Sequence, residues 1–217
     1  MGELPSPVVL VVMGVSGAGK STIAALLAER LGWTFEEGDS LHPQGNVEKM
    51  AAGIPLTDDD RWPWLAKVAD WIDGRLDTGE NGIITCSALK HSYRTIINRR
   101  GSGVEFVYLA VDRAELEERV NHREGHFMPS SLLASQLATL EPPLPPEPAI
   151  QVDAGTDAQL VVDRVMRQLG VKPAPLVSAI PPKKSPLKRS TAVKGGAAPK
   201  SPPTPRSRSP RQSQPPS

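Results

Sequence analysis

The feature that most constrains this chain is a glycine-rich loop between an apolar run and a helix-like segment. Residues 14–22 read GVSGAGKST and match the Gly-x-x-x-x-Gly-Lys-Ser pattern of a phosphate-binding loop. Residues 8–13 before it predict a buried strand, and residues 23–28 after it predict a helix. This context argues against the alternative, a chance glycine-rich turn.

Glycines let the backbone approach a phosphate chain closely, and the loop amides together with the start of the helix attract anions. We therefore expect a nucleoside triphosphate to bind here, with Lys20 on its β- and γ-phosphates and the Ser21 hydroxyl on Mg²⁺. The predicted nucleotide-binding residues of the loop are Gly14, Val15, Ser16, Gly17, Ala18, Gly19, Lys20, Ser21 and Thr22.

The charge of the chain is distributed unevenly. The formal net charge of 217 residues is +1, but residues 171–217 hold ten Lys or Arg and no Asp or Glu, which leaves 15 basic and 24 acidic residues in 1–170. The same C-terminal stretch contains twelve prolines and few large apolar residues. Such a composition cannot offset the entropy of ordering, so we expect a folded domain at 1–170 and a disordered basic tail at 171–217.

Two further features bear on the compartment. A single cysteine, Cys86, excludes an intrachain disulfide, and we interpret it as a buried strand residue. The first residues lack a basic segment before a secretory-length apolar run, and residues 8–13 are too short to span a membrane. The sequence therefore predicts a cytoplasmic protein without a membrane segment.

Strand-like and helix-like segments alternate along residues 8–169, which predicts an α/β domain with a mainly parallel sheet covered on both faces. Strands are expected at 8–13, 33–37, 82–86, 104–111 and 149–152. Helices are expected at 19–31, 47–52, from Thr57 through Leu76, and at 92–100, 114–123, 130–140 and 158–169. Ligands bind such sheets at the carboxyl ends of the strands, where the phosphate loop, Asp39, Ser87 and Asp112 should gather.

Polar residues at these positions suggest phosphoryl-transfer chemistry. Glu37 and Asp39 would share a side if the strand continued, and Asp39 could accept or orient a hydroxyl proton. A solvated loop explains this pair equally well. His42, three residues after Asp39, taken alone is more often a structural hydrogen-bond partner than a functional group.

Several cations stand at positions that an anion site would use. Arg61 lies in the first turn of a predicted helix, where a cation opposes the helix dipole, so it is expected to pair with an anionic substrate or a neighbouring Asp. Lys90 and Arg94 are four apart, which predicts either an anion site or a solvated basic face. Arg119 and Arg123, also four apart, suggest a mobile lid over ATP with Gly125 as a hinge, or ordinary capping of a helix end.

At this point the chain resembles the short, P-loop type of gluconokinase over roughly residues 8–169. The resemblance is carried by GVSGAGKST at 14–22, EGDSLHPQGNVEKMAAGIPLTDDDRWPWL at 37–65, CSALKHSYR at 86–94 and RVNHREGHFMPSSLLASQLATLE at 119–141. It implies a three-layer P-loop kinase fold with a five-stranded parallel sheet and a lid, related to shikimate and nucleoside monophosphate kinases. The tail lies outside the family pattern.

The resemblance also implies an activity: ATP-dependent phosphorylation of D-gluconate at its 6-hydroxyl, giving 6-phospho-D-gluconate for the pentose phosphate pathway. Asp39 matches the acceptor-side carboxylate and Arg123 the lid arginine, while the substrate pocket is matched by His42, Arg61, Lys90, Arg94 and His126. The family often has Asp where Glu37 stands, so contact of Glu37 or Asp39 with Mg²⁺ is expected to run through water. Similar gluconokinases imply a homodimer.

Two other functions remain open from the sequence. The first is a P-loop kinase for shikimate or a nucleotide, which the His-Pro turn and the Asp-Asp-Asp-Arg block disfavour. The second is a nucleotide-regulated binding protein, although the Asn-Lys-x-Asp motif typical of GTPases does not occur.

The tail could bind nucleic acid, an anionic membrane, acidic partners or the acidic surface of its own domain. A solvated tail without a single partner is the preferred interpretation.

Overall fold

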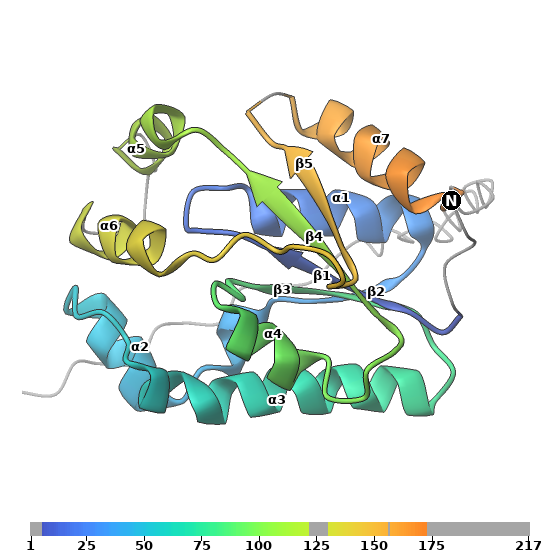
Figure 1. Ribbon diagram of the computed structural model, residues 1–217, viewed down its shortest axis with the longest axis horizontal. Coiled ribbons are helices and arrows are strands. Elements are labelled where there is room, and N and C mark those ends of the chain that lie inside the picture. The colour runs from blue at the N-terminus through green and yellow to red at the C-terminus, as the bar shows by residue number, and fades with distance from the viewer. Residues whose placement is uncertain (1–5, 122–129, 156, 173–217) are drawn as a thin grey trace, which may run out of the picture. The chain divides into compact units, whose positions relative to one another are not determined.

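The computed structural model describes residues 6–121, 130–155 and 157–172, which form a parallel sheet covered by helices on both faces (Figure 1). Its five strands, in the order β2-β3-β1-β4-β5, are β1 (Val9–Met13), β2 (Thr34–Glu36), β3 (Gly82–Cys86), β4 (Val104–Ala110) and β5 (Ala149–Asp153). Every pair of neighbouring strands is parallel. The predicted fold class is therefore confirmed.

The helices form the two outer layers and one end of the molecule. In Figure 1, α1 (Lys20–Leu31) and α7 (Ala158–Leu169) lie on one face of the sheet, and α3 (Asp58–Asp77) and α4 (His91–Ile97) on the other. The remaining helices gather near the carboxyl ends of the strands: the 3₁₀ helix η1 (Gly38–Leu41), α2 (Gln44–Ala51), α5 (Arg113–Asn121) and α6 (Ser130–Thr139). This end carries the phosphate loop.

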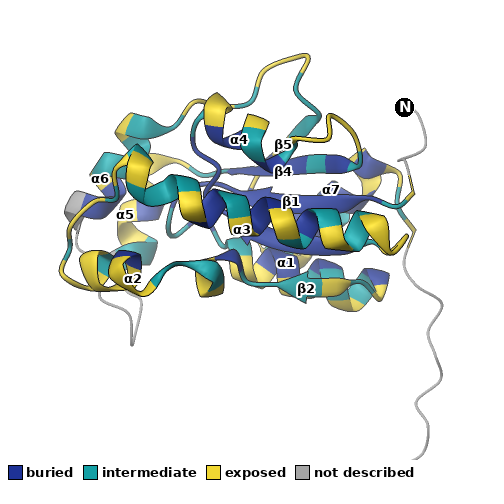
Figure 2. Cartoon of the chain, turned by 90° about the horizontal axis from the view of Figure 1, so that it is seen from below, coloured by how far each residue is buried: buried dark blue, intermediate teal, exposed yellow. Residues whose placement is uncertain are grey.

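The core lies between the sheet and these helix layers. All five residues of β1 are fully buried, as expected for the central strand of a sheet covered on both faces. The predicted apolar stripe of α3 is confirmed for Leu65, Val68 and Ile72, which are buried, whereas the opposite side of this helix is exposed (Figure 2).

Helix ends follow the local signals in the sequence. α1 ends at Gly32, whose left-handed conformation (φ 68°) lets its N–H donate to the carbonyl of Ala28. Thr57 and Asp60 form the predicted capping box, in which the Thr57 side chain accepts from the Asp60 N–H and the Asp60 side chain accepts from the Thr57 N–H. These two caps fix where the phosphate-loop helix ends and where the helix that carries Arg61 begins.

Most boundaries of the described elements lie within one residue of the prediction, and three differences are instructive. The second strand ends at Glu36 because the chain tightens into η1 directly afterwards. α2 begins at Gln44, three residues early, because Pro43 precedes the helix and its carbonyl accepts from the N–H groups of Asn46 and Val47. α4 ends at Ile97 because the chain turns at Gly101, which has a positive φ of 72°. The predicted lid lies outside the described residues.

Candidate functional site

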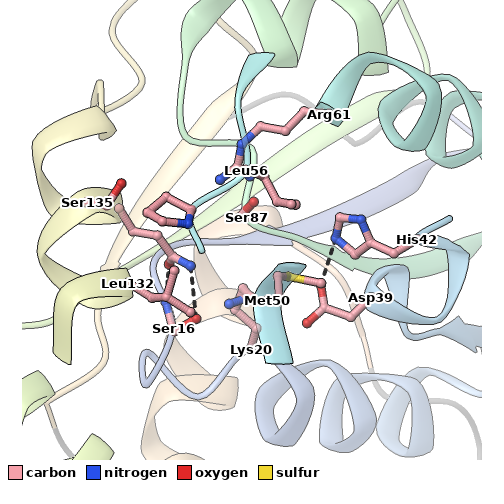
Figure 3. A pocket seen from close by; sticks show the side chains of 12 residues that line it. Ser16, Lys20, Asp39, His42, Met50, Leu56, Arg61, Ser87, Leu132 and Ser135 are labelled. Carbon is pink, nitrogen blue, oxygen red and sulfur yellow. Dashed lines mark hydrogen bonds and ion pairs between the residues drawn. The ribbon is translucent and has the colours of Figure 1, made fainter. Parts of the chain in front are cut away.

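A pocket opens at the carboxyl ends of the strands, where five separate segments meet (Figure 3). The phosphate loop and α1 supply one wall, η1 and its C-cap a second, the chain from α2 to α3 a third, and α6 a fourth, and Ser87 contributes from the segment after β3. Its lining residues are Ser16, Lys20, Asp39, His42, Met50, Pro55, Leu56, Arg61, Ser87, Leu132, Ser135 and Gln136. The structure therefore brings together Lys20, Asp39, His42 and Arg61, as the sequence predicted.

The phosphate loop depends on its glycines for conformation and for space. Gly14, Gly17 and Gly19 all have positive φ, at 141°, 84° and 90°. A Cβ on Gly14 would lie 3.0 Å from the carbonyl oxygen of Leu109, and one on Gly17 would lie 3.1 Å from Val120 Cγ2. Other residues would strain the backbone and press against β4 and α5, so the loop keeps its curve only with glycine.

The side chain of Lys20 closes this loop from within. Its Nζ donates to the carbonyl oxygen of Val15 at 3.2 Å, across the turn of the loop. The ammonium group therefore lies next to the backbone of the loop, and Lys20 lines the pocket. This is the position in which a lysine can meet the terminal phosphates of a nucleotide.

Asp39 is positioned by tight packing of η1 on β3. The N–H of Gly38 donates to Thr85 Oγ1 at 3.0 Å, and its carbonyl accepts from Trp64 Nε1 at 2.7 Å. A Cβ on Gly38 would lie 1.9 Å from the carbonyl oxygen of Thr85, so only glycine allows this approach. The backbone of the next residue is therefore fixed, whereas the Asp39 side chain, 66% exposed, remains available to a ligand.

His42 is held in one orientation. Its ring stacks on Trp64, and Asn46 Nδ2, which also donates to the carbonyl of Asp60, lies 3.3 Å from His42 Nδ1. Because an amide nitrogen can only donate, Nδ1 accepts and the ring proton belongs on Nε2, 4.0 Å from Asp39 Oδ1 (Figure 3). Burial lowers the pKa of His42 to about 4, against the smaller opposing effect of Asp39. The imidazole is therefore a neutral donor facing Asp39.

Glu37 does not share a side with Asp39. Because the strand ends before it, its carboxylate turns toward β3 and accepts a hydrogen bond from the hydroxyl of Thr85. It is absent from the pocket lining. The prediction that both acids face one site rested on a continuing strand and is wrong.

Arg61 is the cation that reaches the pocket from α3. Its guanidinium carbon lies 5.8 Å from the ring centroid of Tyr93, whose hydroxyl donates to Asp58 Oδ1 at 2.5 Å. Lys90 Nζ donates to both carboxylate oxygens of Asp58, each at 2.8 Å. Lys90 is thus paired with an acid beside the pocket and does not line it, in contrast to the prediction.

Arg94 is not in the pocket either. Its side chain is 2% exposed and forms a bidentate pair with Glu147, with Nε to Oε2 at 2.6 Å and NH2 to Oε1 at 3.0 Å. Its NH1 donates to the carbonyls of Ala88 and Glu141. The predicted common face of Lys90 and Arg94 is wrong because Lys90 precedes α4 as its N-cap, whereas Arg94 points into the protein.

A second hollow, lined by Ala110, Val111, Asp112, Glu115, Gln151 and Asp153, lies where β4 and β5 end. Arg119 stands beside it: its NH2 donates to Glu115 Oε1 at 2.5 Å and to the carbonyl oxygen of Ala154 at 2.8 Å. Asp112 therefore joins this hollow and not the pocket of Asp39 and Ser87. Arg123 and His126, predicted to complete the site, lie outside the described residues.

Some pocket residues were not predicted. Leu132, Ser135 and Gln136 reach it from α6, and Gln136 contacts Ser16 of the phosphate loop. Asn46, which orients His42, is 6% exposed. Asn46 stands four residues after His42, a spacing that could have indicated the contact, but the polar residues of α6 resemble those of any helix surface.

Three further observations concern the cysteine, metal-ligand clusters and helix hydrophobicity. Cys86 is fully buried at the end of β3, which confirms it as a buried strand residue, and burial raises the pKa of its thiol to about 12. Among the residues that the structure describes, no group of three or more His, Cys, Asp or Glu could hold a metal ion by itself. Within the same residues no helix is both long and apolar enough to cross a membrane.

Known proteins match this architecture and its site. A family model described as an AAA domain matches residues 9–143. The gluconokinase of Gluconobacter oxydans (strain 621H) is 52% identical over 161 residues, which cover 74% of this chain and 90% of that protein.

Two crystal structures agree with this relationship. A gluconokinase from Sinorhizobium meliloti 1021 is 47% identical, with a TM-score of 0.69 over 76% of this chain and 92% of the other. A sugar kinase from Janibacter sp. HTCC2649, solved without ligand, is 46% identical, with a TM-score of 0.71 over 77% of this chain and 96% of the other. With its phosphate loop and these relatives, the chain belongs to the gluconokinase family.

Proposed function

We propose that this chain transfers the γ-phosphoryl group of ATP to the 6-hydroxyl of D-gluconate, giving 6-phospho-D-gluconate and ADP. One observation carries the proposal beyond family membership: the phosphate-loop lysine, an exposed carboxylate and an arginine line the same pocket. Phosphoryl transfer to a sugar acid needs groups that bind the phosphates, a group that orients the acceptor hydroxyl, and a cation that pairs with the substrate carboxylate.

The phosphate side of the reaction belongs to residues 14–22. The loop amides bind the β-phosphate, and Lys20 exchanges its bond to Val15 for the β- and γ-phosphate oxygens, where it offsets the charge of the transferred group. Arg119 and Arg123 stay predicted contacts of the nucleotide. The hollow beside Arg119, near Gly155, is where we place the adenine.

The acceptor side belongs to η1 and α3. Asp39 accepts a hydrogen bond from the 6-hydroxyl and aligns its oxygen with the γ-phosphorus, and the neutral His42 donates from Nε2 to a further hydroxyl oxygen. Arg61 binds the gluconate carboxylate through its planar pair of N–H groups. Lys90 helps to position Arg61 indirectly: it binds Asp58, Asp58 binds the Tyr93 hydroxyl, and the Tyr93 ring lies against Arg61. His126 remains a predicted substrate contact.

Arg94 has a different role in this proposal from the one predicted for it. Its contacts with Glu147 and Glu141 join α4 to the proline-rich segment 141–148 that leads into β5. We therefore regard it as a structural residue that holds this edge of the domain in place.

The family implies Mg²⁺, and the oxygen atoms at the site suit it. Mg²⁺ prefers one or two protein oxygens together with phosphate oxygens and water. Ser21, at the start of α1, and the exposed Asp39 offer such oxygens, whereas the carboxylate of Glu37 is occupied by Thr85. When bound, the ion would neutralise the phosphates; Ser21 would hold it directly and Asp39 through water.

The test is a coupled assay of ADP release with gluconate, shikimate, glucose and nucleoside monophosphates as acceptors. We expect release only with gluconate. Phosphorylation of shikimate or a nucleotide without gluconate would support another P-loop kinase. ATP hydrolysis that no sugar acid stimulates would instead favour a nucleotide-regulated binding protein.

Other expectations stay proposals on the basis of the sequence. They are a homodimer, a cytoplasmic location, a domain boundary near residue 170, and contact of the basic residues 171–217 with anionic partners. Size-exclusion chromatography with light scattering would test the dimer directly.

A further inference from the structure

Gln136 on α6 makes two hydrogen bonds to Ser16 of the phosphate loop, 120 positions away in the sequence. Its Oε1 accepts from the Ser16 N–H at 2.7 Å, and its Nε2 donates to Ser16 Oγ at 3.2 Å. Both bonds are partly buried, and both residues line the pocket. This side chain therefore connects α6 with the phosphate loop.

The amide that Gln136 occupies is one that a nucleotide would need. The backbone N–H groups of a phosphate loop point toward the phosphate chain and donate to its oxygens. A carboxamide oxygen at 2.7 Å from the Ser16 nitrogen fills the place of such an oxygen. A phosphate oxygen is charged and forms a stronger bond with the same N–H, so it can displace the carboxamide.

We propose that Gln136 stands in for a phosphate oxygen and competes with the nucleotide for the Ser16 amide. In the absence of nucleotide it satisfies this N–H, which would otherwise lack a protein partner. When phosphate enters, Gln136 releases Ser16. The inference rests on the proposed function only in taking residues 14–22 as the nucleotide site.

α6 does not need this contact to stay on the domain. Leu132 and Leu133 are 6% and 3% exposed and bury the helix against its neighbours independently of Gln136. Leu132 and Ser135 of the same helix line the pocket that also contains Asp39 and Arg61. Release of Gln136 therefore loosens one wall of that pocket while the apolar anchor holds, which links nucleotide binding to the acceptor side.

The test compares ADP binding by calorimetry in the full-length wild type and three variants. Gln136→Met keeps the length of the side chain but removes the competing oxygen, and we expect it to bind ADP about three- to tenfold more tightly, the ratio that one lost neutral hydrogen bond predicts. Gln136→Glu bonds the Ser16 N–H more strongly and repels phosphate, so it should bind ADP at least about tenfold more weakly. Gln168→Met, the same change at an exposed position of α7, should bind ADP like the wild type.

The outcomes separate this inference from the proposed function. If Gln136→Met binds ADP as the wild type does or more weakly, the competition is absent and the inference fails, while gluconate phosphorylation can still stand. If the wild type binds no ADP, both fail. Melting temperatures check folding: the inference requires a larger ADP-induced rise for Gln136→Met than for the wild type, and an equal or smaller rise overturns it.

Discussion

The imidazole ring of His42 lies flat against the indole of Trp64, with ring centroids 4.0 Å apart and planes inclined by 16°. The same indole donates its N–H to the carbonyl of Gly38 at 2.7 Å. One buried side chain of α3 therefore holds both ends of the short turn that carries Asp39. The position of Asp39, the proposed acceptor-side acid, depends on this tryptophan, although Trp64 touches no substrate in the proposed mechanism.

His42 makes stability depend on pH. Burial holds its pKa near 4, against 6.5 for a free histidine. Above pH 6.5 the residue is neutral in both the folded and unfolded states; between about pH 6.5 and pH 4 only the unfolded chain gains the proton, so the free energy of unfolding falls as pH falls. We expect His42→Asn to flatten this decline in urea denaturation across the same window.

A matched control is available for that experiment. His91→Asn replaces a histidine whose side chain is 65% exposed and lies 3.2 Å from Glu147 Oε2, and it measures how much of the decline comes from a histidine outside the site. If His42→Asn loses stability with falling pH as steeply as the wild type, the buried neutral state of His42 is refuted.

Asp39→Asn should lower kcat by about 100-fold or more and leave the Kd for ADP nearly unchanged. An amide cannot take the hydroxyl proton, and general-base contributions of this kind are about 10²–10⁴-fold. Steady-state kinetics and calorimetry measure the two effects. Asp59→Asn, an exposed neighbour at the start of α3, serves as the control. Wild-type turnover in Asp39→Asn would contradict the acceptor-side assignment.

Arg61→Met should raise the KM for gluconate about 10- to 100-fold and change the KM for ATP much less. This rise corresponds to the binding energy lost when the charge-assisted hydrogen bonds between Arg61 and the gluconate carboxylate are removed. Arg61→Lys keeps the charge without the planar fork, so its KM should fall between those of Met and the wild type. A larger rise in the KM for ATP would place Arg61 on the nucleotide side.

Arg94→Met should destabilise the fold by about 3–5 kcal/mol, because the carboxylate of Glu147, only 13% exposed, loses its bidentate guanidinium partner. The pKa of Glu147 is lowered to about 2, mainly by its hydrogen bonds with Arg94, and this shows how strongly the charged carboxylate is held. Thermal and urea denaturation measure the loss. Arg99→Met, on the exposed surface, should cost far less. If the variant were as stable as the wild type but had a raised KM for gluconate, the result would support the substrate-binding role first predicted for Arg94.

Removal of residues 172–217 should leave kcat within about twofold, since the described fold ends with α7 and Val171 packs on the core. The truncated and full-length enzymes are compared in the same ADP-release assay. A large loss of kcat on truncation would show that the basic segment takes part in turnover.

Local sequence signals determined most of the fold. The order of strands and helices, the phosphate loop, the end of α1 at Gly32 and the capping box of α3 each depend on residues close together in the chain. Hydrophobic periodicity and caps act over a few residues, so they can be recognised without a structure. The candidate residues Lys20, Asp39, His42 and Arg61 were likewise predictable because each stands in or beside such a signal.

The tertiary structure alone decided which polar residues meet. Nothing near Arg94 indicates that Glu147, 53 positions later, neutralises it, or that Lys90 pairs with Asp58. Glu37 and Asp39 diverge because η1 packs on Thr85 of another strand. Gln136 reaches Ser16 only because α6 folds back over the loop. The sequence by itself determined the helices and strands and the polar groups available at one end of the sheet. The partner of each charged side chain depended on contacts between distant segments. Such contacts follow no regular period or spacing in the sequence, so they cannot be recognised there.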